Sequence, residues 1–138
     1  MPIPDDARPV LALMPAIADQ SQWMLAVTGL KAGEYEVRID DALVARFSAE
    51  AFTKGCNLGT LEKGPVADQG RNVLALIAAK EGLVGQFRGK SASVATVPAD
   101  QAKAALDPIN QQVLEADAKI RAAAQPKAHR FTIRPVTQ

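Results

Sequence analysis

The sequence predicts an α+β fold, in which a small antiparallel β-sheet built from both ends of the chain packs with an antiparallel helix pair from the middle. Three observations predict this fold. Residues 34–40 alternate strictly between polar and apolar, as a half-buried strand does. Between residues 65 and 124, apolar side chains recur at spacings of three and four, which is the helical period. Residues 131–134 alternate again, and such a strand needs a sheet edge to pair with.

Prolines mark the beginning of the chain. Pro2, Pro4 and Pro9 predict an extended, non-helical start, because proline removes a backbone donor and restricts the residue before it. Residues 10–14 are apolar and predict a short strand. Residues 15–22 then predict a loop with at most one helical turn.

The next stretch carries the strands. Residues 23–27 are rich in apolar and β-branched side chains and predict a strand, and residues 28–33 supply a turn bounded by glycines. In residues 34–40 one face of the strand is apolar and is expected to be buried. The residues on this face are Tyr35, Val37 and Ile39.

A hairpin and a short helix follow. Asp40 and Asp41 stand where a two-residue hairpin turn is expected, although Asp-Gly suits the positive φ of such a turn better. The returning strand, residues 43–47, is expected to turn Leu43, Ala45 and Phe47 to one side. Ser48 is a good N-cap for a helix over residues 49–54, and Gly55 is placed to end it.

Two longer helices are predicted in the middle of the chain. Gly64-Pro65 opens the first, and its core-facing side chains are expected to be Val66, Val73, Leu76, Ile77, Val84 and Phe87. Three glycines, Gly82, Gly85 and Gly89, weaken its C-terminal end. Residues 91–97 predict a polar connector with a brief extended piece.

Residues 99–106 predict a short helix that precedes a break or a kink. Asp107 and Pro108 resemble an N-cap followed by proline at the first helical position, so a new helix is expected there, running to about residue 124. Its apolar stripe consists of Leu106, Ile109, Val113, Ala116, Ile120 and Ala123. The stripe predicts an antiparallel pair with the preceding helix.

Length and composition fit one globular domain. The chain has 138 residues, of which 48% are hydrophobic and 22% charged. We therefore expect a single domain over residues 1–138. Within it, residues 9–61 form the hairpin region, residues 65–124 the helix pair and residues 129–136 the final strand.

Charge and cysteine content exclude several classes. Sixteen Lys and Arg against fifteen Asp and Glu leave a net charge of +1, which gives no reason to expect a nucleic-acid partner. The one cysteine, Cys56, excludes an intrachain disulfide and a multi-cysteine zinc site. No apolar run approaches the roughly 18 residues that cross a bilayer. We expect a soluble chain, and the first residues lack the basic end and apolar stretch of a signal peptide. The cellular compartment is left open.

Four linked motifs carry a resemblance to a known family. They are Val27-Thr28-Gly29-Leu30, the strand from Gly33 through Tyr35 to Ile39-Asp40, Phe47-Ser48-Ala49-Glu50 and Gly55-Cys56-Asn57-Leu58. With the early prolines, the helical middle and the His-x-Phe tail, nearly the whole chain resembles the C-terminal region that follows the hydrolase domain in bacterial SGNH/GDSL-type hydrolase-like proteins. The resemblance implies that full-length relatives are exported.

The chain departs from that family in two respects. The family usually has Asp-Gly at the hairpin, and Asp41 occupies the glycine position. In addition, the Gly-Asp-Ser nucleophile block, the oxyanion glycine, the Gly-x-Asn-Asp block and the terminal Asp-x-x-His of an SGNH hydrolase do not occur here. Asn57 is not followed by the Asp of the oxyanion block. The family's catalytic roles therefore transfer to no residue of this chain.

His129 is the one histidine and the ordinary candidate for a general base near neutral pH. A surface histidine at the start of a strand is the simpler interpretation. Asp40 and Asp41 are candidates to activate water or to hold Ca²⁺ or Mg²⁺, which prefer oxygen ligands. A solvated turn is the simpler interpretation of this acidic pair, and no cofactor is firmly implied. A buried, packed Cys56 is likewise simpler than a nucleophile.

Aromatic and basic side chains are candidates for ligand binding. Trp23, Tyr35 and Phe47 are candidates for a platform that holds a sugar or an acyl chain, although core packing fits them at least as well. Arg130 and Arg134 share one strand face and are candidates to bind a carboxylate or a phosphate. A solvated basic edge is the alternative for these two arginines.

These features leave three hypotheses for function. The first is a noncatalytic accessory module of an SGNH/GDSL-type ester hydrolase, which would dock on a hydrolase domain or form a homodimer. The second is a small stand-alone hydrolase of esters or lactones, in which His129 or the carboxylates of Asp40 and Asp41 activate water. Its activity would be either dependent on a divalent cation or independent of one. The third is a carbohydrate-binding module. Whether the chain is an enzyme is left open by the sequence.

Overall fold

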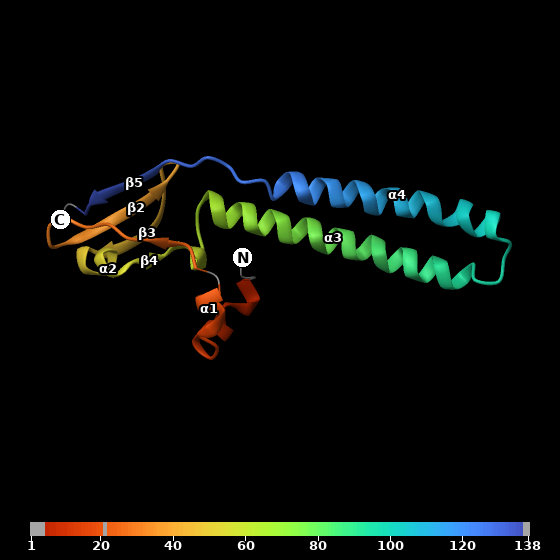
Figure 1. The fold of residues 1–138 in the computed structure, drawn as a ribbon, viewed down its shortest axis with the longest axis horizontal. Helices are drawn as coiled ribbons and strands as arrows, with labels where there is room; N and C mark the ends of the chain where they lie inside the picture. The colour runs from red at the N-terminus through yellow and green to blue at the C-terminus, as the bar shows by residue number, and fades with distance from the viewer. Residues whose placement is uncertain (1–4, 21, 137–138) are drawn as a thin grey trace. The chain divides into compact units, whose positions relative to one another are not determined.

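The computed structural model describes residues 5–20 and 22–136. The chain divides into two compact units. One consists of residues 1–71 and 126–138 and is called the strand unit below. The other consists of residues 72–125 and is called the helix unit. Figure 1 shows the strands and α2 in the first unit and most of the two long helices in the second.

A three-stranded antiparallel sheet organises the strand unit. Its strands are β2 (Glu34–Ile39), β3 (Ala42–Ser48) and β5 (Phe131–Pro135), in the order β3-β2-β5. The last strand thus completes the sheet begun by the hairpin, as the blue and orange arrows in Figure 1 show. The predicted α+β class is confirmed, including an antiparallel sheet made from both ends of the chain.

The strand β2 owes its central place to its alternation. Tyr35 is 8% exposed, and Val37 and Ile39 are fully buried. Phe52, in α2 (Ala49–Lys54), is also fully buried. Its ring meets the ring of Tyr35 edge to face, with the ring centroids 6.3 Å apart. Burying these side chains removes enough apolar area to stabilise the unit by about 2 kcal/mol each.

The hairpin turn has the predicted place and geometry. Asp40 and Asp41 have φ values of 49° and 67°. A type I′ turn requires positive φ at both central residues, and Asp tolerates that region better than most residues with a Cβ. Two aspartates therefore form the turn that Asp-Gly usually forms.

The side-chain pattern predicted for β3 is wrong at its first residue. Val37 pairs with Ala45 and Arg38 pairs with Leu43, so Val44 is an extra residue in a β-bulge. The bulge turns Val44 into the core, where it is 7% exposed. Leu43 lies opposite a charged residue on the polar face and is 38% exposed.

The short helix α2 has both predicted caps. The Ser48 hydroxyl accepts a hydrogen bond from the Ala51 N–H at 3.1 Å. Gly55 ends the helix with a φ of 95°, and its N–H donates to Ala51 O at 2.9 Å. These bonds satisfy backbone groups that a helix end otherwise leaves without partners.

The beginning of the chain differs from the prediction. A 3₁₀ helix, η1 (Asp5–Ala12), and a short helix, α1 (Ala16–Gln20), replace the extended start and the strand over residues 10–14. Pro9 is compatible with η1 because its fixed φ lies within the 3₁₀ range. Pro2 and Pro4 lie outside the described residues. The strand expected over residues 23–27 is only two residues long.

That strand, β1 (Met24–Leu25), pairs antiparallel with β4 (Cys56–Asn57). A single-turn 3₁₀ helix, η2 (Leu58–Thr60), follows β4. The pairing joins the first strand of the unit to the exit from α2, so the Gly-Cys-Asn-Leu motif anchors β1.

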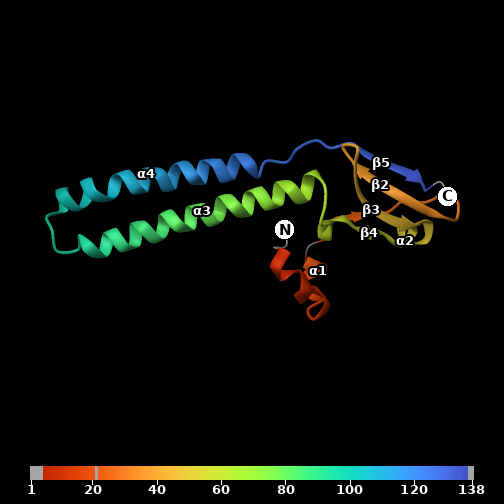
Figure 2. The same cartoon turned by 180° about the vertical axis from the view of Figure 1, so that it is seen from behind.

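The helix unit contains most of α3 (Pro65–Ser93) and the whole of α4 (Ala99–Ala123). Figures 1 and 2 show the two helices running antiparallel and side by side. Lys80 of α3 and Asp117 of α4 form an ion pair at 2.7 Å. The predicted helix pair is therefore confirmed.

Two details of the helices are corrected. The helix α3 continues through Gly82, Gly85 and Gly89 to Ser93, so the predicted connector begins three residues later, at residue 94. Pro108 lies inside α4, so the predicted break and new helix at Asp107 are wrong. The Asp107 carboxylate pairs with Lys103 one turn earlier and does not cap a helix.

Candidate functional site

The structure brings together two of the predicted catalytic candidates, Asp40 and His129. Asp40 follows the last residue of β2, and His129 precedes β5. The His129 Nδ1 atom lies 2.6 Å from Asp40 Oδ2. The His129 side chain is 11% exposed, whereas the Asp40 side chain is 44% exposed. The Asp40 carboxylate thus holds the imidazole at the end of the sheet where β2 ends and β5 begins.

Backbone hydrogen bonds hold Asp40 in place. Asp40 Oδ1 accepts a hydrogen bond from the Arg130 N–H at 2.8 Å. The Asp40 N–H in turn donates to Arg130 O at 3.0 Å. These bonds continue the pairing of β2 and β5 beyond the ends of both strands, so the Asp40 carboxylate uses one oxygen for the main chain and the other for the imidazole.

The hydrogen bonds also determine the charge of Asp40. The hydrogen bond from His129 and, next, that from the Arg130 N–H hold the pKa of the Asp40 carboxyl below its ordinary value. An ionised carboxylate only accepts hydrogen bonds, so Nδ1 of His129 must carry the hydrogen between them. In the neutral imidazole the other nitrogen, Nε2, then has a free lone pair.

That lone pair forms no hydrogen bond with the part of the protein that the structure describes. Within residues 5–20 and 22–136, no protein group forms a hydrogen bond with His129 Nε2, and no buried side-chain nitrogen or oxygen lacks a partner. Nε2 is therefore not buried. A histidine held at Nδ1 by a carboxylate and open at Nε2 has the arrangement of a general base oriented by an acid.

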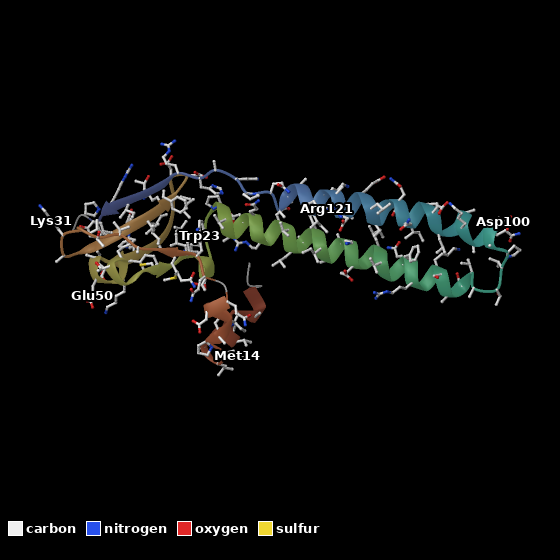
Figure 3. The ribbon with its side chains drawn as sticks, viewed as in Figure 1. Met14, Trp23, Lys31, Glu50, Asp100 and Arg121 are labelled. Carbon is white, nitrogen blue, oxygen red and sulfur yellow. The ribbon has the colours of Figure 1, made fainter. Side chains whose placement is uncertain are left out.

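An aromatic pair lies on the same side of β5. The rings of Trp23 and Phe131 meet edge to face, with centroids 5.6 Å apart and an interplanar angle of 84°. Each of these residues is 39% exposed. His129 precedes Phe131 by two residues, the interval after which side chains in an extended chain return to the same face. Figure 3 labels Trp23 within the strand unit.

The main chain of Trp23 is bonded on both sides. Its N–H donates to Asn57 Oδ1 at 3.0 Å, and its carbonyl accepts from the Leu58 N–H at 2.7 Å. Asn57 Oδ1 also accepts from the Gly59 N–H at 2.8 Å. Asn57 is thus a structural residue that positions Trp23 and caps η2.

Asp41 is not drawn into this cluster. Its carbonyl oxygen accepts a hydrogen bond from Arg38 Nη1 at 2.8 Å, and its side chain points to no described partner. Among the described residues, no three His, Cys, Asp or Glu side chains lie close enough together to hold a metal ion. The predicted Ca²⁺ or Mg²⁺ site at Asp40 and Asp41 stays a prediction.

Tyr35 and Cys56 lie in the core. The Tyr35 hydroxyl donates to Lys31 O at 2.9 Å, so a buried ring carries a satisfied polar end. Cys56 is 5% exposed, and burial raises the pKa of its thiol. A buried thiol with a raised pKa is a poor nucleophile, which agrees with the packing role expected for it.

The polar face of the sheet carries the predicted arginines. Arg134 lies opposite Glu36 in the register of β5 and β2. Glu36 accepts hydrogen bonds from Arg38 at 3.2 Å and from Arg46 at 2.8 Å, and the bonds from Arg46 and then Arg38 lower the pKa of its carboxyl. Arg130 and Arg134 are exposed. The carboxylate or phosphate site predicted for them stays a prediction.

The helix unit has a shallow groove of about 280 Å³ between α3 and α4. Its lining consists of Leu76, Ala79, Leu83, Gln112, Glu115, Ala116 and Lys119. Every residue from 72 to 125 retains some exposure, and none of them is buried. The hydrogen bonds from Lys80 and Arg121 lower the pKa of the Asp117 carboxyl beside this groove.

Sequence reasoning missed the contact of Trp23 with Phe131 and the bond of Asp40 to His129. The His129-x-Phe131 spacing was a usable signal, because it places both side chains on one face of an extended chain. No local pattern pairs residue 40 with residue 129. That pairing depends on β5 joining β2 in one register, which only the folded sheet reveals.

Comparison with known proteins yields one informative similarity. No protein-family model and no curated protein matches the sequence. Among solved structures, the gut microbial diltiazem-metabolizing enzyme BT4096 is similar in fold, with a TM-score of 0.65 and 21% sequence identity. The similarity covers 83% of this chain and 34% of that enzyme. The chain therefore has the fold of about one third of a larger enzyme chain.

Proposed function

We propose that this chain is an accessory module that docks on a hydrolase domain of the SGNH/GDSL type its sequence resembles. The single observation that carries the proposal is the helix unit, in which 54 residues leave no side chain buried. The fold similarity to one third of an enzyme chain supports it.

The helices have apolar surface to offer a partner. On the helices, Ile77 is 39% and Leu114 57% exposed, and Val97 in the turn between them is 38% exposed. The groove between the helices is lined largely by aliphatic side chains. Isolated helices of this kind are only marginally stable in water, and most of their stability comes from burying one face. A hydrolase domain that covers this surface would supply the missing burial.

Docking is tested by titrating the purified chain into purified SGNH/GDSL hydrolase domains and measuring the mass of the complex by sedimentation. We expect a one-to-one complex. Replacing Leu114 by Glu should weaken it by about tenfold to a hundredfold, because a charge then occupies a desolvated contact. Gln86→Glu is the matched control, since it places the same side chain at an exposed polar position of α3. A chain that remains monomeric with every domain would refute docking.

The other possible partner for this helix surface is a second copy of the chain, which would form a homodimer. Sedimentation of the chain alone distinguishes the two, because self-association depends on the concentration of this protein only. A stable dimer that Leu114→Glu dissociates would assign the helix surface to a second copy.

The second candidate is hydrolysis of a small ester or lactone, with His129 as the base that activates water. The 2.6 Å contact of Nδ1 with Asp40 favours it, as does an Nε2 atom that is not fully buried and that no described group bonds. A chromogenic ester and a lactone, each assayed with and without a chelator, test the activity. We expect His129→Ala to abolish turnover and Asp40→Asn to lower it by roughly a hundredfold or more. Equal rates in both variants and the parent would exclude these residues, and loss of activity with chelator alone would point to the cation.

A further inference from the structure

Three side chains from two distant parts of the sequence lie at one end of the sheet. Trp23 lies just before β1, Phe131 begins β5, and His129 lies two residues ahead of it. We call these three residues the aromatic site. Their rings lie outside the buried core, which is centred on Val37, Ile39 and Phe52.

The aromatic site offers two kinds of contact. Trp23 and Phe131 leave 39% of their surfaces open to solvent, although large aromatic rings gain most by full burial. Their edge-to-face contact leaves ring surface on which a flat or apolar ring can pack. Beside them, His129 Nε2 offers a lone pair, which accepts a hydrogen bond from a hydroxyl group.

We propose that Trp23, Phe131 and His129 form a binding site for a ring that carries a hydroxyl group, either a phenol or a sugar. The ring packs on the indole and the phenyl group, and its hydroxyl donates to Nε2. This inference shares His129 with the second candidate function, but it concerns binding alone and holds whether or not any bond is broken.

The parts of the site are held before a ligand arrives. The main-chain N–H and carbonyl of Trp23 are bonded to the loop that leaves α2, at 3.0 and 2.7 Å. The Asp40 carboxylate orients the imidazole at Nδ1 and so keeps the lone pair on Nε2. A site whose groups are already oriented loses less entropy on binding, which favours a weak but specific contact with a small ring.

The chain provides its own reporters for a test. It has one tryptophan and one histidine, so indole fluorescence reports on Trp23 and the imidazole proton signals in an NMR spectrum report on His129. The probes are para-cresol and its methyl ether, which has the same ring but no hydroxyl donor. Methyl β-glucoside and cellobiose form the sugar arm. These two arms distinguish a phenol site from a sugar site.

We expect one arm to change the Trp23 fluorescence and the His129 signals with the same midpoint. If that arm is the phenols, the methyl ether should bind about threefold to tenfold more weakly, since it lacks one hydrogen bond. His129→Ala should remove this preference, and Phe131→Ala should weaken both probes. Gln86→Ala, at an exposed polar position of α3, is the control that should leave both signals unchanged.

Three results would overturn the proposal. One is equal affinity of the parent for para-cresol and its methyl ether with no response to the sugars. Another is a fluorescence change without movement of the His129 signals. The third is the absence of any response to both arms at about 10 mM. Because the NMR titration uses the unaltered chain, it decides the question even if Phe131→Ala fails to fold.

Discussion

Asp40 has several structural roles at once. It takes a left-handed conformation in the hairpin turn, it accepts hydrogen bonds at both carboxylate oxygens, and its own N–H donates to Arg130. The structure gives this acid a physical reason, since no other residue type both tolerates positive φ and offers two acceptor oxygens.

Acid should weaken the link between the turn and β5. The pKa of Asp40 lies below its ordinary value in the folded chain, so its contribution to stability is complete above that ordinary value and is lost as pH falls through the folded pKa. Asp40→Asn should therefore lower the midpoint of thermal unfolding near neutral pH and flatten its decline below about pH 4. Asp41→Asn is the control, and equal pH profiles for Asp40→Asn and the parent would contradict the assignment.

Asp41 should be replaceable by glycine with a gain in stability. It has a φ of 67°, and its side chain holds no described partner. Glycine adopts this φ without the steric cost of a Cβ, which is roughly 1 kcal/mol for Asp in a type I′ turn. Urea unfolding should show Asp41→Gly to be more stable by about 0.5 to 1 kcal/mol. Asp40→Gly should be less stable than the parent, and a loss of stability in Asp41→Gly would give that side chain a function of its own.

The bulge in β3 determines what surrounds Gly64. A Cβ at this residue would lie 2.4 Å from Val44 Cγ1, and its φ is 95°. Gly64→Ala should therefore destabilise the chain by about 2 kcal/mol or more, through both the clash and the strained backbone.

Gly29→Ala separates these two causes. Gly29 also has a positive φ, 79°, but a Cβ there would meet no atom within 4 Å. Urea unfolding should show a smaller loss in Gly29→Ala, of about 1 kcal/mol. Adding Val44→Ala to Gly64→Ala should recover the part of the loss that comes from the clash. Equal losses in the two glycine variants would mean that Val44 moves aside.

The helix α4 carries a proline that it does not need for its fold. Pro108 lacks the N–H that would bond one turn back, and in a helix interior proline is less favourable than alanine by about 3 kcal/mol. Pro108→Ala should raise the free energy of unfolding by about 1 to 3 kcal/mol and increase the helical circular dichroism signal. Pro98→Ala, at the N-cap, should change little. A neutral Pro108→Ala would indicate that the helix already relieves the clash by bending.

Local patterns predicted the elements well and their connections less well. The alternation of β2 and the caps of α2 follow from residue types a few positions apart, and the structure agrees with them. The bulge at Val44 and the uninterrupted helix through Pro108 depend on packing that no short window contains. At the candidate site, His129 and Asp40 were each identified by their chemistry, whereas their contact depends on pairing between strands about 90 residues apart.

At the scale of the molecule, the two units differ in how much they bury. Among the described residues, the buried hydrophobic side chains all lie between residues 35 and 58, in the strand unit. None of the helices in the described part of the chain is long and apolar enough to span a bilayer. The hydrolase domain proposed above would cover the apolar side chains that the helix unit leaves exposed.

Hydrogen exchange should reveal this difference in the chain alone. Amides in residues 72–125 should exchange through local openings of lower free energy than those of β2, because fewer apolar contacts resist each opening. Mass spectrometry of peptides from the two units measures the contrast. Addition of a docking hydrolase domain should slow exchange in the helix unit. Equal protection of both units in the isolated chain would show that the helices are stable without a partner.

The pairing of β5 with β2 has a consequence for synthesis. The central strand, β2, is synthesised early, but it can pair with β5 only after the last described residues have left the ribosome. The helices α3 and α4 are made during that interval, because they lie between β3 and β5 in the sequence. Until β5 pairs with it, β2 has an unpaired edge to which another nascent chain can bind. The bond between Asp40 and His129 forms only when the β5 segment lies beside that edge.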